Sequence, residues 1–99
     1  MADYYLGVDI GGTKSHALVV DNRGRAISVG RAGAGNYENV GWDGLHRTLG
    51  FVVSQALDAA SLTVDQIGGA GFGIAGYDWP GERPPHLDAI ARLGLTCPV

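Results

Sequence analysis

Two adjacent glycines between two apolar segments constrain the fold of this chain more than any other feature. Residues 4–10 alternate apolar side chains with Tyr, Gly and Asp, which predicts a strand with one buried face. Residues 15–20 are rich in apolar side chains and predict a second strand, and the intervening Gly11-Gly12 pair favours a tight turn. The sequence therefore predicts an antiparallel hairpin in which Asp9 lies near the turn.

The next segment continues the sheet and then changes its period. Residues 21–24 read Asp-Asn-Arg-Gly, which predicts a turn, and residues 26–31 predict a third strand. Apolar residues then recur at steps of three and four across residues 40–60, the pattern of an amphipathic helix. We expect Asn39 to cap this helix and Asp43 to lie favourably near its positive N-terminal end.

The last forty residues predict one more strand and one more helix. Thr63 and Gln66 have the spacing of a capping box, and residues 67–75 predict a buried strand. Prolines precede a helix expected at residues 86–93, and residues 96–99 resemble the start of a fifth strand. This order predicts an α/β fold with a three-stranded antiparallel meander, a crossover helix and a parallel fourth strand.

Composition excludes several classes of function. Ninety-nine residues with 45% hydrophobic content suit one domain or part of one. A net charge of −3 without a basic run gives no footprint for nucleic acid, and no apolar stretch is long enough to span a bilayer. The single Cys97 excludes an internal disulfide, and the three histidines have no zinc-ligand spacing. We therefore expect a cytoplasmic protein without a nucleic-acid or membrane partner.

Two familiar glycine motifs fail on their structural context. Residues 7–14 are similar to a P-loop motif, but Thr13 precedes Lys14, the reverse of the order in that motif. A strand is also predicted to follow, whereas a P-loop presents a helix N-terminus to phosphate. Residues 71–76 spell a dinucleotide fingerprint, but they lie within a predicted strand and no helix follows directly. We expect neither motif to bind a nucleotide in its usual way.

A glycine hairpin can bind phosphate in a different way. The N–H groups of Gly11 and Gly12 can approach anion oxygens closely because no side chain intervenes, while Thr13 and Lys14 add a hydroxyl and a cation. Asp9 at the strand end could hold Mg²⁺ through water, since Mg²⁺ tends to keep part of its hydration shell. On these residues alone, a phosphate site and a purely structural turn are equally consistent.

Three blocks of sequence resemble one known family. Residues 7–14 (GVDIGGTK), 34–37 (AGNY) and 73–78 (GIAGYD) are similar in order and spacing to blocks of the BadF/BadG/BcrA/BcrD ATPase family, which includes N-acetylglucosamine kinase. The resemblance implies a ribonuclease-H-like fold of the actin-like ATPase superfamily, duplicated in two lobes around an ATP cleft. Residues 1–99 would be the N-terminal part of the first lobe, truncated before that lobe is complete, and the second lobe would belong to a longer chain.

The resemblance also implies a role for individual residues. Asp9 would bind Mg²⁺ of Mg²⁺–ATP through water, and Asn36 would bind sugar hydroxyls, since an amide both donates and accepts hydrogen bonds. Tyr37 would line the sugar pocket, and Asp78 is a further candidate for substrate binding. The phosphates of ATP would be held by Gly11, Gly12, Thr13 and Lys14.

Three functions are compatible with this resemblance. The first is ATP-dependent phosphoryl transfer to a sugar, N-acetylglucosamine or a similar hexosamine. The second is an ATPase activator of a 2-hydroxyacyl-CoA dehydratase or benzoyl-CoA reductase type system, and the third is a non-catalytic nucleotide-sensing module. The catalytic carboxylate implied by the family lies beyond Val99, so residues 1–99 alone are expected to be inactive. An incompletely covered sheet would favour self-association, with a homodimer as the simplest case.

Overall fold

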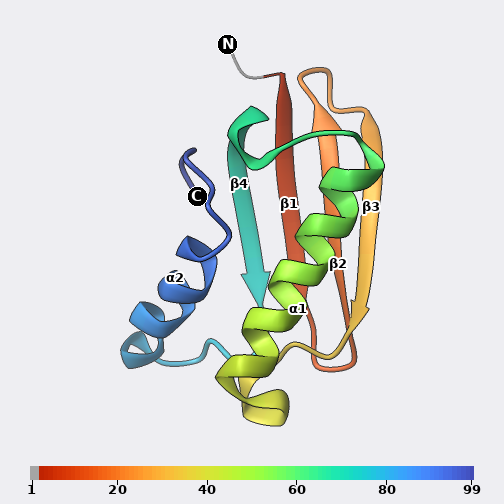
Figure 1. The fold of residues 1–99 in the computed structure, drawn as a ribbon. Helices are drawn as coiled ribbons and strands as arrows, with labels where there is room; N and C mark the ends of the chain where they lie inside the picture. Colours follow the sequence, from red (N-terminus) through yellow and green to blue (C-terminus); the bar gives the residue numbers. More distant parts are fainter. Residues whose placement is uncertain (1–2) are drawn as a thin grey trace.

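One mixed sheet organises the chain, with a long helix packed on one of its faces (Figure 1). The computed structural model describes residues 3–99, in which four strands have the order β3-β2-β1-β4. The strands are β1 (Tyr4–Ile10), β2 (Lys14–Asp21), β3 (Ala26–Gly33) and β4 (Ile67–Ile74). The helices are α1 (Tyr37–Ala59) and α2 (Arg83–Ala91), with short 3₁₀ turns at Val64–Gln66 and Pro80–Glu82. The predicted meander, crossover helix and parallel fourth strand are all confirmed.

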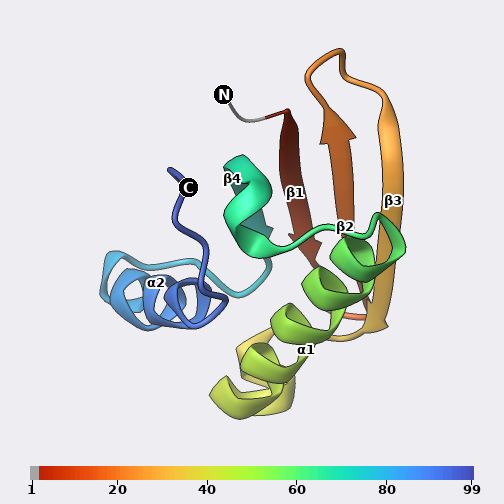
Figure 2. The same cartoon turned by 45° about the horizontal axis from the view of Figure 1, so that its top comes forward.

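The direction of the strands determines where loops gather. β1 pairs antiparallel with β2 and parallel with β4, so the carboxyl ends of β1 and β4 lie at the same edge of the sheet. The register places Asp9 opposite Gly73 and Ile10 opposite Ile74. Figure 2 shows that the β1–β2 turn and the start of α1 lie at this edge as well. In α/β sheets, ligands characteristically bind at such an edge.

The core lies between α1 and one face of the sheet. Alternate residues of β1 and β2 point inward, as their period of two requires, and meet the apolar stripe of α1. Gly30 allows close packing, because a Cβ there would lie 2.1 Å from the Val52 carbonyl oxygen. The buried apolar residues of these elements are Leu6, Val8, Ile10, Ala17, Val19, Leu45, Leu49, Val52, Val53, Ala56 and Leu57.

The start of α1 differs from the prediction. Its N-cap is Asn36, whose Oδ1 accepts a hydrogen bond from the Glu38 N–H at 3.0 Å, whereas Asn39 lies inside the first turn. Gly41 interrupts the helix with φ of 74°, a conformation that glycine adopts without a steric penalty. Asp43 follows this break, so it lies in the first turn of the longer helical segment rather than near the cap. The apolar periodicity of the sequence predicted the long part of α1 after Gly41 but not the short helical turn before Gly41.

The end of the chain also differs from the expectation. α2 begins three residues earlier than predicted, because Pro84 and Pro85 occupy its first turn, where their missing N–H groups cost little. Residues 96–99 form no strand, although the Pro98 carbonyl accepts a hydrogen bond from the Ala70 N–H of β4 at 3.0 Å. The C-terminal segment therefore lies along the outer edge of β4.

The sheet face opposite α1 carries exposed apolar side chains. Those of Tyr5, Leu18, Ile27 and Val29 are each about 40% exposed. This face matches the expectation of an incompletely covered sheet. Neither helix in residues 3–99 has the length and apolar character needed to cross a membrane.

The β2–β3 turn provides a test of the fold that is separate from function. Asp21 accepts hydrogen bonds from the Arg25 and Arg23 N–H groups at 2.9 Å, and its Oδ2 lies 2.8 Å from the Arg25 Nε. The Arg25 N–H is the largest of the causes that lower the pKa of Asp21, and burial opposes them. Such a carboxylate stabilises the fold above its unfolded pKa, and the contribution is lost as pH falls through the folded pKa.

We therefore expect the melting temperature of the chain to fall as pH is lowered below about 4. Asp21→Asn should lower the melting temperature at pH 7 and make it less sensitive to pH in the acidic range. Asp58→Asn, at an exposed position near the end of α1, is the control. Identical pH profiles for the Asp21 and Asp58 variants would contradict this role of Asp21.

Candidate functional site

Three loops are tied together by backbone hydrogen bonds at the carboxyl edge of β1 and β4. The Gly35 N–H donates to the Gly11 carbonyl at 3.0 Å, which ties the segment before α1 to the β1–β2 turn. The Ala75 N–H donates to the Ile10 carbonyl at 2.8 Å, which ties the segment after β4 to the end of β1. These bonds bring the three sequence blocks 7–14, 34–37 and 73–78 together.

The glycines of the hairpin serve different purposes. The Gly11 N–H donates to the Lys14 carbonyl at 3.0 Å, and a Cβ on Gly11 would lie 2.5 Å from that oxygen. The turn therefore requires glycine at position 11 and uses its N–H. A Cβ on Gly12 would meet no atom within 4 Å, and the φ of Gly12 is not in the left-handed region. The fold therefore does not require glycine at position 12. Gly12 and Thr13 are both exposed, so an anion can approach their N–H groups.

Asp9 is the acidic side chain at the carboxyl end of β1. It is exposed at the end of β1, and its Oδ1 faces Gly73, where a Cβ would be 3.9 Å away. Neither ion pair within residues 3–99 involves Asp9. Residues 3–99 hold no cluster of three or more His, Cys, Asp or Glu side chains that could enclose a metal ion. A lone carboxylate still fits Mg²⁺, which is commonly held by one or two carboxylates, waters and substrate phosphates.

Asn36 combines a structural role with an amide donor that has no hydrogen-bond partner among residues 3–99. Its Oδ1 is the capping oxygen of α1, which leaves the Nδ2 amide hydrogens for another partner. Gly76, with φ of 92°, lies directly against this amide, and a Cβ there would be 2.2 Å from Oδ1. Glycine at position 76 thus allows the segments before α1 and after β4 to meet, with the Asn36 amide between them.

The other two predicted substrate residues have different surroundings. Tyr37 is half-buried, and its ring stacks on Trp42 with ring centroids 4.0 Å apart. Asp78 is exposed, and its backbone N–H donates to the Glu82 Oε1 at 3.0 Å in the turn before α2. Tyr37 therefore packs on Trp42 within α1, whereas Asp78 lies in a loop at the surface.

Sequence reasoning missed an aromatic cluster beside Asn36. His86 of α2 stacks on Tyr77 at 5.1 Å and meets Trp42 edge to face at 5.0 Å. Spacing in the sequence gives His86 no partner, because residues from α1, α2 and the β4 loop meet here only through the fold. Residues 73–78 (GIAGYD) include Tyr77, but the sequence of this block does not indicate that Tyr77 has a partner on α2.

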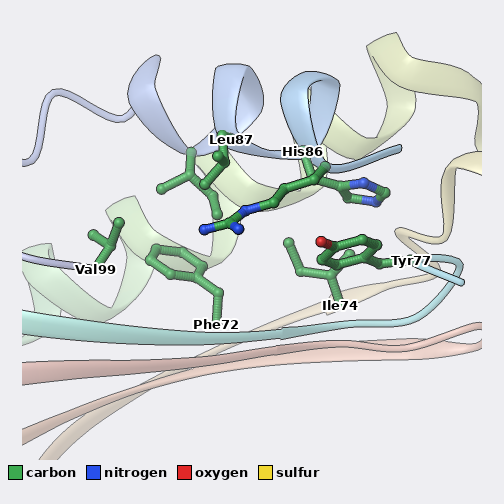
Figure 3. Close-up of a pocket in the computed structure, with 8 residues that line it drawn as sticks. Phe72, Ile74, Tyr77, His86, Leu87 and Val99 are labelled. Atoms are coloured by element: carbon green, nitrogen blue, oxygen red, sulfur yellow. The ribbon is translucent and has the colours of Figure 1, made fainter. Parts of the chain in front are cut away.

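A cavity lies between β4 and α2 rather than at the hairpin (Figure 3). It has a volume of about 260 Å³, is open to solvent on one side and is mostly apolar. None of the predicted site residues lines it, although Tyr77 and His86 connect it to the aromatic cluster. The lining residues are Phe72, Ile74, Tyr77, Arg83, His86, Leu87, Ile90 and Val99.

The chemistry available at the sheet edge is that of binding and positioning. The hairpin tip offers backbone donors and the Lys14 cation, Asp9 offers a carboxylate, and Asn36 offers an amide donor. Such groups can hold a phosphate, a hydrated cation and a hydroxyl-bearing molecule close together. This set suits phosphoryl transfer, in which catalysis depends on positioning and charge neutralisation.

Two solved sugar-kinase structures resemble this chain in fold. One, named as that of a candidate N-acetylglucosamine kinase from Chromobacterium violaceum, has a TM-score of 0.64 and 20% identity, over 98% of this chain and 34% of that chain. The other is a ROK family glucokinase from Streptomyces griseus in complex with glucose and AMPPNP, with a TM-score of 0.64 and 28% identity, over 97% of this chain and 32% of that chain. The present chain thus spans about a third of the length of either protein. Comparison with curated protein sequences gave no significant match.

These similarities confirm the α/β fold of the actin-like ATPase superfamily expected from the three sequence blocks. The model of the BadF/BadG/BcrA/BcrD ATPase family matches residues 6–97, which include the hairpin, Asn36 and the segment after β4. Because this match covers nearly all of the 99 residues, the chain belongs to the BadF/BadG/BcrA/BcrD ATPase family.

Proposed function

We propose that the full-length protein containing this chain is an ATP-dependent sugar kinase that phosphorylates N-acetylglucosamine or a similar hexosamine. The observation that carries the proposal is the convergence of the hairpin tip, Asp9 and Asn36 on one edge of the sheet, tied by the bonds from Gly35 and Ala75. The family is one of ATPases, and both solved structures are named as sugar kinases. This chain would supply the phosphate-binding side of the cleft.

Each group has a defined task in this proposal. The N–H groups of Gly12 and Thr13 bind phosphate oxygens, and the Lys14 ammonium adds positive charge. The Asp9 carboxylate holds a hydrated Mg²⁺, which supplies charge neutralisation to the phosphates when bound. The Asn36 Nδ2 donates to an oxygen of the acceptor, while its Oδ1 stays bonded to the start of α1. The hydroxyl that attacks phosphorus would be deprotonated by the carboxylate that the family resemblance places beyond Val99.

The match to an ATPase family is also compatible with a different activity, which the resemblance implied: ATP hydrolysis that drives a partner enzyme of the dehydratase or reductase type. Both activities would use the hairpin and Asp9, but only the kinase needs an acceptor site at Asn36. The free Nδ2 of Asn36 beside Gly76 favours the kinase. Sugar-dependent ADP release by the full-length protein separates the two activities.

Substitution of Gly12 tests the phosphate site. Gly12→Ala should leave the melting temperature of the chain nearly unchanged, because a Cβ there meets no atom within 4 Å. The added methyl should keep phosphate away from the N–H groups, so kcat/KM for ATP should fall about tenfold or more in the full-length protein. Gly81→Ala is a matched control, since that glycine also has open space around its Cβ position. Normal ATP kinetics in Gly12→Ala would remove position 12 from the phosphate site.

Substitution of Asp9 tests the cation. Asp9→Asn keeps the shape of the side chain but removes the charge that would hold hydrated Mg²⁺. Turnover should fall by about a hundredfold or more while the fold remains stable, and more Mg²⁺ should be needed to reach half-maximal rate. Asp58→Asn on α1 is the control. An unchanged Mg²⁺ dependence in Asp9→Asn would show that the cation is held elsewhere.

Substitution of Asn36 tests the acceptor site. Asn36→Ser keeps an oxygen that can cap α1 but removes the amide donor. KM for the sugar should rise with a cost of about 1–3 kcal/mol, and KM for ATP should stay the same. Asn39→Ser changes the same residue type within the first turn of α1 and should leave both constants unchanged. Equal effects on sugar and ATP in Asn36→Ser would indicate a structural role only.

A further inference from the structure

The cavity between β4 and α2 has the size and shape of a site for a small molecule. Figure 3 shows Phe72 and Val99 at one end, and the Tyr77 and His86 rings facing each other at the other end. Its volume of about 260 Å³ is enough for about nine non-hydrogen atoms, at roughly 30 Å³ for each. Because the cavity is open on one side, a molecule can bury an apolar part there and keep a polar end near solvent.

Arg83 brings a positive charge to the wall of this cavity. Leu87 and Ile90, which also line it, follow Arg83 by four and seven residues, so the three side chains share one face of α2. Arg83 is exposed, whereas Ile90 is buried, so the charge lies where solvent and a dissolved ligand can reach it. One face of α2 thus combines a cation with an apolar surface.

The acidic residues nearest to Arg83 in the sequence have other partners. The Glu82 Oε1 accepts hydrogen bonds from two backbone N–H groups of the turn before α2, at 3.0 and 2.9 Å. The Asp88 Oδ2 lies 3.1 Å from a guanidinium nitrogen of Arg92. Neither of the two ion pairs formed by the described residues includes Arg83. Its charge is therefore available to an anion from outside the chain.

The kind of anion follows from the charge and shape of this site. An arginine side chain is planar and can bind a carboxylate through two parallel hydrogen bonds. One arginine balances the single charge of a carboxylate, whereas a phosphate monoester carries about −1.5 to −2 at pH 7. The mostly apolar wall favours an aliphatic tail, since each buried CH₂ strengthens binding about fourfold.

We propose that the β4–α2 cavity is a binding site for a medium-chain aliphatic carboxylate. The carboxylate binds Arg83, and the tail lies against Phe72, Leu87 and Ile90. This site is separate from the hairpin, Asp9 and Asn36, since none of the residues predicted to bind ATP or sugar lines the cavity. The inference therefore goes beyond the proposed kinase function and does not depend on it.

The test measures binding of octanoate to the full-length protein by titration calorimetry. Octanoate should bind with a dissociation constant of about 1 mM or below, and hexanoate, which is two CH₂ groups shorter, about tenfold more weakly. Arg83→Gln should raise the dissociation constant of octanoate about tenfold. The same variant should bind octan-1-ol as the unmodified protein does, because this ligand has the tail without the charge.

A matched variant controls for the loss of an arginine. Arg92→Gln removes a guanidinium group that is paired with Asp88 and does not line the cavity, so octanoate affinity should stay the same. Octanoate should also shift the methyl NMR signals of Leu87 and Ile90, which locates it in the cavity. Because Arg83 is exposed, Arg83→Gln should keep the melting temperature of the unmodified protein.

Three results would overturn the proposal. The first is that the full-length protein does not bind octanoate, and the second is that the methyl shifts lie outside the cavity. The third is an equal loss of octanoate and octan-1-ol affinity in Arg83→Gln, the result expected if Arg83 only covers apolar surface with its methylene groups. Should Arg83→Gln not fold, Arg83→Lys decides instead, since it keeps the charge but loses the paired hydrogen bonds and should weaken octanoate binding alone.

Discussion

The parallel pairing of β1 with β4 is the constraint on which the candidate site depends. It places Asp9 beside Gly73 and brings the ends of both strands to one edge of the sheet. Asp9 and the segment after Ile74 are more than 60 residues apart in the sequence. If β4 ran antiparallel to β1, that segment would lie at the opposite edge of the sheet, far from Asp9. α1 makes the parallel arrangement possible, because it carries the chain from the end of β3 back to the start of β4. The buried apolar stripe of α1 therefore both fills the core and holds the connection that brings the two strand ends of the candidate site together.

Glycine is required at this edge for reasons that differ from position to position. Gly11 allows the hairpin to close on the Lys14 carbonyl, and Gly76 allows the β4 loop to meet the Asn36 amide. Both are explained by contacts within the chain. Gly12 is not, since its Cβ position is open and its φ is ordinary. The proposed approach of a phosphate to its N–H group would give position 12 a reason to be glycine.

The parts of the fold that follow from local periodicity could be predicted from the sequence. The alternation in residues 4–10 and the helical stripe that includes Leu45, Leu49 and Val52 correctly gave β1 and most of α1. The start of α1 could not be predicted in this way, because Gly41 separates a short capped turn from the stripe. The cluster around His86 was missed because its rings come from three elements. Contacts of that kind depend on tertiary packing, which no spacing in the sequence reports.

Asn36 shows how stability and the proposed sugar binding are linked at this edge. Its Oδ1 is bonded to the Glu38 N–H and lies against Gly76, so the amide plane is fixed before any ligand arrives. A fixed amide directs Nδ2 without the entropy cost of ordering a free side chain on binding. The same bond caps α1, whose next residue, Tyr37, begins the aromatic cluster. The orientation of the amide donor, the first turn of α1 and the position of Tyr37 therefore depend on one another, and a substitution that removes the capping oxygen of Asn36 acts on all three.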